Sequence, residues 1–176
     1  MGRGQARDVL PIRALNSDIW GYQPVQLTER GFRCVVYDRH SRSADLGEAY
    51  DCDTLAADLA AAMDGLDLRN VSLVGYSMGR GEITRYISPY GAGRVSRILL
   101  TSPVAPGPGD LAKSESFIKA LKKDRQVFMA GSLPLFLGRD MAVSPAMQQW
   151  VLEQFLRSRL PAGSWWGRCP TAILRY

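Results

Sequence analysis

The segment Val71-Ser72-Leu73-Val74-Gly75-Tyr76-Ser77-Met78-Gly79 places a serine between two glycines, directly after an apolar run. A helical pattern follows over residues 82–87. This order predicts a strand, a sharp turn with Ser77 at its apex, and a helix. The turn holds the serine in a strained conformation, and a side chain at Gly75 or Gly79 would collide with neighbouring backbone. The alternative is an ordinary strand-to-helix turn whose serine caps the helix.

Ser77 is the candidate nucleophile of the chain. A Gly-x-Ser-x-Gly turn pushes the serine hydroxyl out at the carboxyl end of its strand, where a substrate can reach it. The backbone N–H of Met78 would then lie at the N-terminus of the helix, where the helix dipole favours a developing oxyanion. The motif therefore indicates a nucleophilic role for Ser77, with Met78 as an oxyanion donor.

The composition is that of a soluble globular protein with one domain. The chain has 176 residues, of which 46% are hydrophobic and 22% charged, and a chain of this length can bury a core. No apolar run reaches the roughly 18 residues that span a bilayer, and no apolar signal core follows the basic N-terminal residues. We therefore predict a cytoplasmic protein without membrane contacts. The three cysteines have no metal-like spacing and are expected to be free thiols: Cys34, Cys52 and Cys169.

The net charge of +5 comes from the two ends of the chain. Residues 1–13 carry a net charge of +2 and residues 157–176 one of +4, which leaves −1 for the middle. A face that binds nucleic acid would show a basic stripe on one element. We therefore expect no nucleic-acid binding. A salt-dependent affinity for random DNA would support the opposite hypothesis of a basic nucleic-acid binder.

The residues before the elbow predict strands and helices in alternation. A short strand is expected at 8–12, where Pro11 restricts it to a sheet edge or a strand end. Apolar residues between 19 and 27 suggest a helix, with Pro24 disturbing its middle. A β-branched and aromatic run predicts a strand at 32–37.

A second helix is expected over residues 55–66, capped by Asp53 or Thr54. Its apolar stripe consists of Leu55, Leu59, Ala62, Met63 and Leu66. The elbow helix is expected to run to about Tyr90. It is followed by a buried strand at 95–101 that is apolar on both faces, as parallel strands are.

This alternation predicts an α/β fold, a three-layer doubly wound parallel sheet with right-handed crossovers. Ligands in such sheets bind beyond the carboxyl ends of the strands, where Ser77 is expected. After residue 102 two amphipathic helices, at 114–127 and from 144 onward, suggest a partial helical cap. The alternative is a simple helical extension of the core. We predict a core at 8–106, a partial cap at 107–160 and an irregular tail at 161–176.

The block at 66–79 resembles the α/β-hydrolase fold. Residues 82–86, 93–95 and 100–106 are similar to one branch of that family, the bacterial cofactor-free haloperoxidases. These proteins, also called non-haem chloroperoxidases, are esterases and perhydrolases. The resemblance covers about residues 15–158 and is specific at the elbow.

The resemblance implies acyl transfer on a small-molecule ester or carboxylic acid, with no metal, haem or other cofactor. In the family, a serine attacks the ester, a histidine relays the proton, an aspartate orients the histidine, and two backbone N–H groups hold the oxyanion. Hydrogen peroxide in place of water gives a peracid, which can oxidise halide. Ser77 matches the nucleophile and Met78 the first oxyanion donor.

The chain departs from the family at other catalytic positions. The family places its aspartate and histidine after two further strands beyond the cap, and a complete member is about 100 residues longer. The single histidine, His40, matches a loop histidine that is not catalytic, and we expect it to be exposed rather than a base. A His-Gly-aromatic turn of the family is replaced by Pro11-Ile12-Arg13. The N–H of Arg13 is the candidate second oxyanion donor.

Arg80 replaces a small residue that the family favours after the elbow. A cation is mildly unfavourable at a helix N-terminus, so we expect this side chain to turn to solvent.

Both arginine-rich ends leave the family pattern. Residues 161–176 show no helical or strand period, and we favour a frameshift or disrupted gene as their origin. The alternative is that Trp165-Trp166 forms an exposed patch for a partner. A sheet that lacks the last strands would expose an apolar edge at 95–101, where we expect self-association. The prediction is a serine esterase or perhydrolase with weak or no activity. The alternative is a non-catalytic pseudo-hydrolase or assembly module that a partner chain completes.

Overall fold

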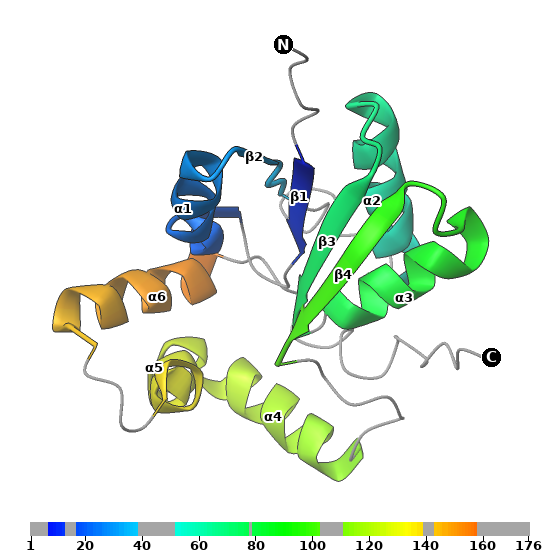
Figure 1. The fold of residues 1–176 in the computed structure, drawn as a ribbon. Coiled ribbons are helices and arrows are strands. Elements are labelled where there is room, and N and C mark those ends of the chain that lie inside the picture. The colour runs from blue at the N-terminus through cyan, green and yellow to red at the C-terminus, as the bar shows by residue number, and fades with distance from the viewer. Residues whose placement is uncertain are drawn as a thin grey trace.

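The computed structural model describes residues 7–12, 17–38, 52–77, 79–102, 111–138 and 143–157. Its centre is a parallel sheet with the strand order β2-β1-β3-β4 (Figure 1). The strands are β1 at Arg7–Ile12, β2 at Phe32–Cys34, β3 at Val71–Tyr76 and β4 at Val95–Thr101. All three pairings between neighbouring strands are parallel, which confirms the predicted sheet.

Helices cover both faces of this sheet (Figure 1). Helix α1, Gln23–Glu29, lies on one face, and α2, Cys52–Gly65, and α3, Gly79–Tyr90, lie on the other. The connection from β1 to β2 runs toward one edge of the sheet, whereas those from β2 to β3 and from β3 to β4 run toward the other. Right-handed crossovers therefore place α1 opposite α2 and α3. The result is the predicted three-layer α/β fold.

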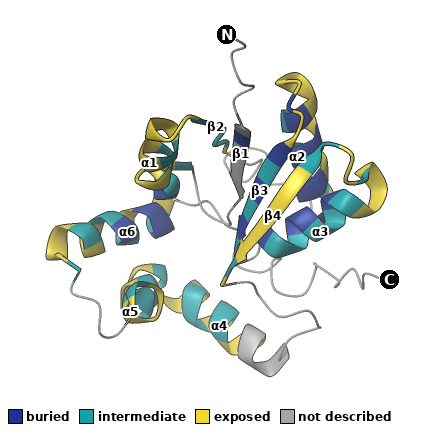
Figure 2. Cartoon of the chain, in the orientation of Figure 1, coloured by how far each residue is buried: buried dark blue, intermediate teal, exposed yellow. Residues whose placement is uncertain are grey.

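The hydrophobic core lies between the sheet and the layer of α2 and α3 (Figure 2). The core residues are Ala56, Leu59, Ala60, Met63, Leu68, Val71, Leu73, Ile83 and Tyr86. Most of the predicted α2 stripe is buried, but Leu66 is 51% exposed because α2 ends at Gly65.

Three helices follow β4 in the described part of the chain, where the sequence predicted two. They are α4 at Leu111–Lys123, α5 at Arg125–Leu137 and α6 at Pro145–Arg157. The backbone N–H of Val127 donates to Asp124 Oδ1 at 3.0 Å, so Asp124 caps α5 and interrupts the helix predicted over 114–127. Val127, in the first turn of α5, is exposed.

The three helices take two different places. Helices α4 and α5 lie beyond the carboxyl end of β4 (Figure 1). Helix α6 packs against α5, where the ring centroids of Phe155 and Phe136 are 4.6 Å apart, and it also reaches the start of α1, where the rings of Trp150 and Tyr22 meet edge to face at 5.9 Å. Arg157 of α6 also forms an ion pair with Asp18 at 3.4 Å. Part of the segment predicted as a cap therefore extends onto the α1 face of the sheet.

The two prolines near the N-terminus sit at tolerated positions. Pro24 lies in the first turn of α1, where its missing N–H costs no helical hydrogen bond. The predicted disturbed helix is thus a 3₁₀ helix, Ser17–Trp20, followed by α1. Strand β1 lies inside the sheet rather than at an edge. Pro11 is near the end of β1, in the part of the strand that pairs with β3 but not with β2.

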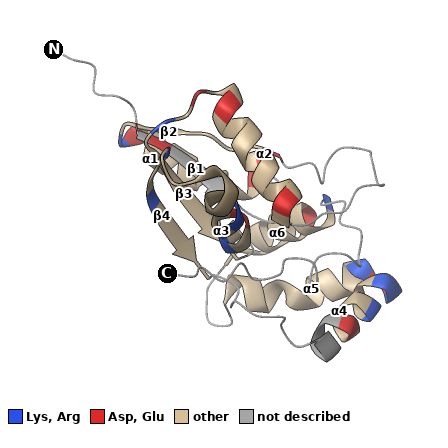
Figure 3. Ribbon diagram, turned by 90° about the vertical axis from the view of Figure 1, so that its right-hand side faces the viewer, with Lys and Arg blue, Asp and Glu red and all other residues tan. Residues whose placement is uncertain are grey.

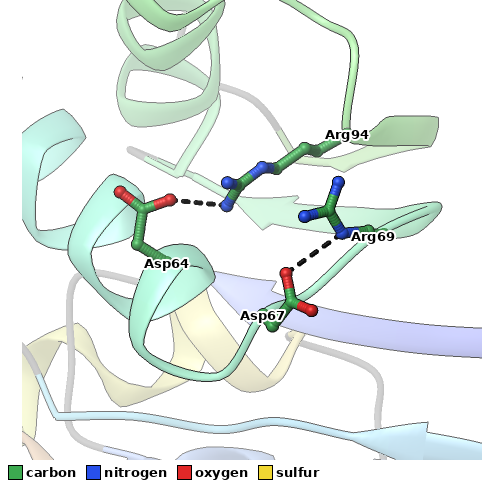
Figure 4. A network of polar contacts seen from close by, with 4 residues as sticks. All are labelled: Asp64, Asp67, Arg69 and Arg94. Atoms are coloured by element: carbon green, nitrogen blue, oxygen red, sulfur yellow. Dashed lines mark hydrogen bonds and ion pairs between the residues drawn. The ribbon is translucent and has the colours of Figure 1, made fainter.

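Charged contacts fix the turns at the amino ends of β3 and β4 (Figure 4). Arg94 Nη1 lies 2.6 Å from Asp64 Oδ1, and Arg69 Nε lies 3.0 Å from Asp67 Oδ1. Elsewhere the described charged residues are spread over several elements in the view of Figure 3, with Lys122 and Lys123 in the last turn of α4. Cations are favourable at that end of a helix.

Strand β4 is not the buried strand that the sequence predicted. Ile98, Leu99 and Leu100 are 44%, 56% and 40% exposed, because β4 is the outermost strand of the described sheet. Figure 2 shows the exposed colour along β4. The predicted apolar edge at 95–101 is therefore present in this structure.

The cysteines differ in state. Cys34 is a free thiol, and burial raises the pKa of this thiol. Cys52 is disulfide-bonded, so the expectation of free thiols is wrong at that position, and Cys169 lies outside the described residues. Disulfides are uncommon in a reducing cytosol, and the cytoplasmic location stays a prediction. Among the described helices, none combines the length and apolar character that a bilayer span requires.

Candidate active site

Ser77 lies directly after β3, whose neighbours in the sheet are β1 and β4. Its φ is 53°, in the left-handed region, which costs free energy for a residue with a side chain. The backbone N–H of Ser77 donates to Thr101 O at 3.1 Å, so the end of β4 holds the strained turn in place. The side chain of Ser77 is half-buried. This is the strand–turn–helix context that the motif predicted.

Only glycine fits at position 75. A Cβ added there would lie 2.8 Å from Ile83 Cδ1, 3.1 Å from the carbonyl carbon of Gly79 and 3.1 Å from Leu100 Cδ2. Strand β3 and the start of helix α3 therefore lie close together at Gly75, where the sequence predicted that a side chain would collide with backbone. This approach sets the sharpness of the turn that carries Ser77.

A buried hydrogen bond fixes the start of α3. Glu82, in the first turn of the helix, is fully buried, and Tyr37 Oη donates to Glu82 Oε1 at 2.8 Å. A buried carboxylate requires such partners. This pair was not predicted from the sequence, because an acidic residue in the first turn of a helix is usual there whether it is buried or exposed.

A surface ion pair adds a second tie between α3 and its neighbour. Arg85 of α3 forms an ion pair with Asp53 in the first turn of α2. Helix α3, and with it the turn at Ser77, is thus held by two contacts. One comes from Tyr37, in the segment after β2, and the other from α2.

The side chain of Arg80 does not simply turn to solvent. Its Nε atom is buried and has no hydrogen-bond partner among the residues that the structure describes, while the residue as a whole is half-buried. The backbone N–H of Arg80 donates to Ser77 O at 3.4 Å. The expectation of a solvated Arg80 is therefore wrong for this nitrogen, which packs at the start of α3.

A second serine lies at the same edge of the sheet. Ser102 follows the last residue of β4, has a φ of 43° and is exposed. It lacks the flanking glycines of Ser77. No role for Ser102 was predicted from the sequence, and this serine serves as a matched control for Ser77.

The other predicted site residues fall outside the described ranges. Met78, Arg13 and His40 are not described, so their predicted roles stay predictions. In the described parts of the chain, no three His, Cys, Asp or Glu side chains gather as a metal site would need. The described residues therefore bring together a serine, the candidate nucleophile, on a strained turn at a helix N-terminus.

An apolar groove lies on the α1 face of the sheet, away from the core. Its volume is about 860 Å³. One wall comes from β3 and β4, with Tyr76 and Leu99, and the other from α1 and α6, with Leu27 and Trp150. Ser77 is not among the described residues that line this groove, but Tyr76 directly before it and Thr101, which accepts its N–H, both do.

Comparison with known proteins identifies the family of this chain. The model of the alpha/beta hydrolase family matches residues 13–175. The chain belongs to this family. The matched range includes most of the tail that we expected to leave the family pattern.

The relatives place the chain in the haloperoxidase and esterase branch of the hydrolases. A non-heme haloperoxidase of Rhodococcus erythropolis is 46% identical over 94 residues, which cover 52% of this chain and 34% of that protein. A Synechocystis protein, provisionally named a non-heme chloroperoxidase, is 36% identical over 164 residues, which cover 87% of this chain. The hydrolase chain described here spans 59% of that relative.

A solved structure shows the same architecture. The bromoperoxidase from Bacillus anthracis has a TM-score of 0.82 and 30% identity, over 94% of this hydrolase chain and 67% of the bromoperoxidase. These likenesses confirm the predicted family and the partial α/β-hydrolase core.

Proposed function

We propose that this hydrolase carries out acyl transfer through Ser77. The observation that carries the proposal is the position of Ser77, at the carboxyl end of β3 with a φ of 53° and directly before α3. The strain of the turn and the close approach at Gly75 hold the serine at the point where substrates of α/β sheets bind. The N-terminus of α3 stabilises negative charge that develops beside it.

In the proposed reaction, Ser77 Oγ attacks the carbonyl carbon of a small-molecule ester. The oxyanion is held by the N–H of Met78, with Arg13 as the candidate second donor. The alcohol leaves, and water or hydrogen peroxide then takes the acyl group from Ser77, which gives an acid or a peracid. A bifunctional esterase/perhydrolase of Acinetobacter calcoaceticus, 35% identical over 112 residues, supports both outcomes as chemistry of this branch.

We further propose that the turnover of this chain alone is weak. Its single histidine is His40, which matches a non-catalytic position of the family, and the family's triad aspartate and histidine come after two further strands beyond the cap. Without a general base Ser77 keeps the low reactivity of an alcohol, so only the oxyanion donors and substrate binding contribute. We expect activity that is orders of magnitude below that of an intact esterase.

Hydrolysis of p-nitrophenyl acetate tests both proposals, the role of Ser77 and the weak turnover. The Ser77→Ala chain should hydrolyse the ester at the rate of the buffer, whereas the matched Ser102→Ala chain should retain the wild-type rate. Equal rates for wild type and Ser77→Ala would contradict a role for Ser77. A Ser77-dependent rate comparable to that of an intact esterase would contradict the proposed weakness.

The exposed edge of β4 favours a second candidate function. Three consecutive apolar side chains are exposed on this strand, and such an edge is a template for pairing with another chain. The alternative to catalysis is therefore a non-catalytic pseudo-hydrolase or assembly module that a partner chain completes, or that associates with itself.

A further inference from the structure

The floor of the groove on the α1 face consists of two matched rows of residues, one on β3 and one on β4. Alternate residues of a strand point to the same face of a sheet, and residues paired across neighbouring strands share that face. Three such pairs line the groove: Ser72 with Arg97, Val74 with Leu99, and Tyr76 with Thr101. The floor therefore has polar side chains at each end and an apolar middle.

The end of the floor at the amino ends of the strands carries a positive charge. Arg97 is the one charged residue among the described residues that line the groove. It is exposed and has no hydrogen-bond or ion-pair partner in the described part of the chain. Asp18 lies next to the lining residue Ile19, but it forms an ion pair with Arg157. The groove thus offers a guanidinium group at one end and no described carboxylate to neutralise it.

The walls above this floor are largely apolar and aromatic. They include rings from the elements that precede β3 and from the helices after β4, namely Trp20, Phe32, Phe136 and Trp150. The volume of about 860 Å³ lies within the range of small-molecule sites, which is roughly 300–1,000 Å³. A ligand that matches these walls and Arg97 is apolar along most of its length and carries an anion at one end.

The spacing along β4 sets the length of such a ligand. Thr101 comes four residues after Arg97, which is about 13 Å at roughly 3.3 Å per residue. An extended chain advances about 1.1–1.2 Å per bond, so about eleven bonds span this distance. We propose that the groove binds a straight-chain fatty carboxylate of about twelve carbons. Its carboxylate lies on Arg97 and Ser72, and its chain runs over Leu99 toward Thr101.

The two ends of the ligand make different contributions. A guanidinium group holds a carboxylate through two parallel hydrogen bonds, but at an exposed position such a pair adds little affinity. The hydrocarbon chain contributes most of the affinity, because each buried methylene group is removed from water. Arg97 therefore decides the charge and orientation of the ligand, and the apolar floor and walls decide its chain length.

The carboxylate site is far from the candidate nucleophile. Ser77 comes five residues after Ser72, which is about 16 Å along the strand direction. The carboxyl carbon held at Arg97 is therefore not a carbon that Ser77 can attack. The fatty carboxylate is a separate ligand of the protein, so this inference goes beyond the proposed acyl transfer.

Isothermal titration calorimetry of the full chain with sodium laurate, kept below its micelle-forming concentration, tests the proposal. We expect saturable one-to-one binding. Dodecyltrimethylammonium has the same chain length and the opposite charge, and it should bind at least tenfold more weakly. Octanoate has four fewer carbons to bury and should also bind at least tenfold more weakly.

Matched variants locate the two ends of the ligand. Arg97→Gln should weaken laurate binding at least fivefold, whereas Arg69→Gln, at an exposed position outside the groove, should change it less than twofold. Leu99 and Leu66 are 56% and 51% exposed, and Leu66 also lies outside the groove. Leu99→Glu should weaken binding at least tenfold, and Leu66→Glu less than twofold. Equal urea midpoints within each pair show that folding does not cause the difference.

Several results would overturn the proposal. They are the absence of saturable laurate binding, equal affinity for dodecyltrimethylammonium, and equal losses for Arg97→Gln and Arg69→Gln. A chain that associates with itself and that laurate does not dissociate would show that a second copy covers the groove, which would also overturn it.

The Ser77→Ala chain separates this site from catalysis. It should bind laurate with the affinity of the wild type, because Ser77 does not line the groove. Loss of binding in this variant would place laurate at the nucleophile and overturn the proposal. A wild-type chain that binds laurate but shows no Ser77-dependent ester hydrolysis would support the groove site and contradict acyl transfer alone.

Discussion

At the scale of single residues, the turn at Ser77 depends on the lack of a side chain at Gly75. Gly75 brings β3 close to α3, and Ser77 accepts an unfavourable φ of 53° two residues later. The motif predicted both features because a Gly-x-Ser-x-Gly turn has few other geometries. The buried Nε of Arg80 could not be predicted in this way, since the motif says nothing about how a side chain after the turn packs.

Gly75→Ala should destabilise the protein and reduce any Ser77-dependent activity. The added methyl group would meet Ile83 Cδ1 at 2.8 Å and backbone at 3.1 Å, and such overpacking costs about 1–3 kcal/mol of unfolding free energy. Gly65→Ala is the control, because a Cβ there meets nothing within 4 Å and should be neutral or stabilising. Urea unfolding measures both changes, and equal effects of the two variants would contradict the close approach.

At the scale of elements, helices and strands with a regular apolar pattern could be predicted from the sequence, whereas the boundaries between neighbouring helices could not. The extents of α2, α3 and β4 follow from their patterns of apolar residues. The break between α4 and α5 depends on the capping bond of Asp124, and the start of α1 on Pro24 in its first turn. Aspartate and proline are each tolerated at more than one position relative to a helix start, so the sequence alone did not define where α5 and α1 begin.

Tyr37→Phe should destabilise the junction between the end of β2 and α3. The substitution removes the hydroxyl that donates to the fully buried Glu82. Loss of a donor to a buried carboxylate costs about 1–3 kcal/mol. Tyr22→Phe is the matched control, because Tyr22 is 60% exposed and its change should stay within about 0.5 kcal/mol. Identical urea midpoints for Tyr37→Phe and the wild type would rule out a stabilising role for the pair.

At the scale of the whole molecule, the described helices cover the two faces of the sheet to different extents. The core lies between the sheet and α2 and α3, while the groove and the edge of β4 stay open on the other side. Strand alternation predicted the layers, and the family resemblance led us to expect an open edge. The groove was not predicted, because it depends on where α6 packs, which no local pattern specifies.

Leu59→Ala tests the position of the core. Leu59 is fully buried, and removal of such a side chain costs about 2–5 kcal/mol because a cavity remains. Leu66→Ala changes the same residue type on the same side of the molecule, but at an exposed position, and should cost no more than about 0.5 kcal/mol. A core centred elsewhere would give similar losses for the two variants in thermal or urea unfolding.

The central claim is that Ser77 is the nucleophile of this hydrolase. Prolonged incubation of the folded chain with excess fluorophosphonate, followed by peptide mapping by mass spectrometry, tests it most directly. The strained, half-buried turn at the N-terminus of α3 predicts a slow covalent adduct on Ser77 and none on Ser102, with the adduct lost after unfolding in urea before labelling. No adduct on Ser77, or equal labelling of Ser77 and Ser102, would contradict the account.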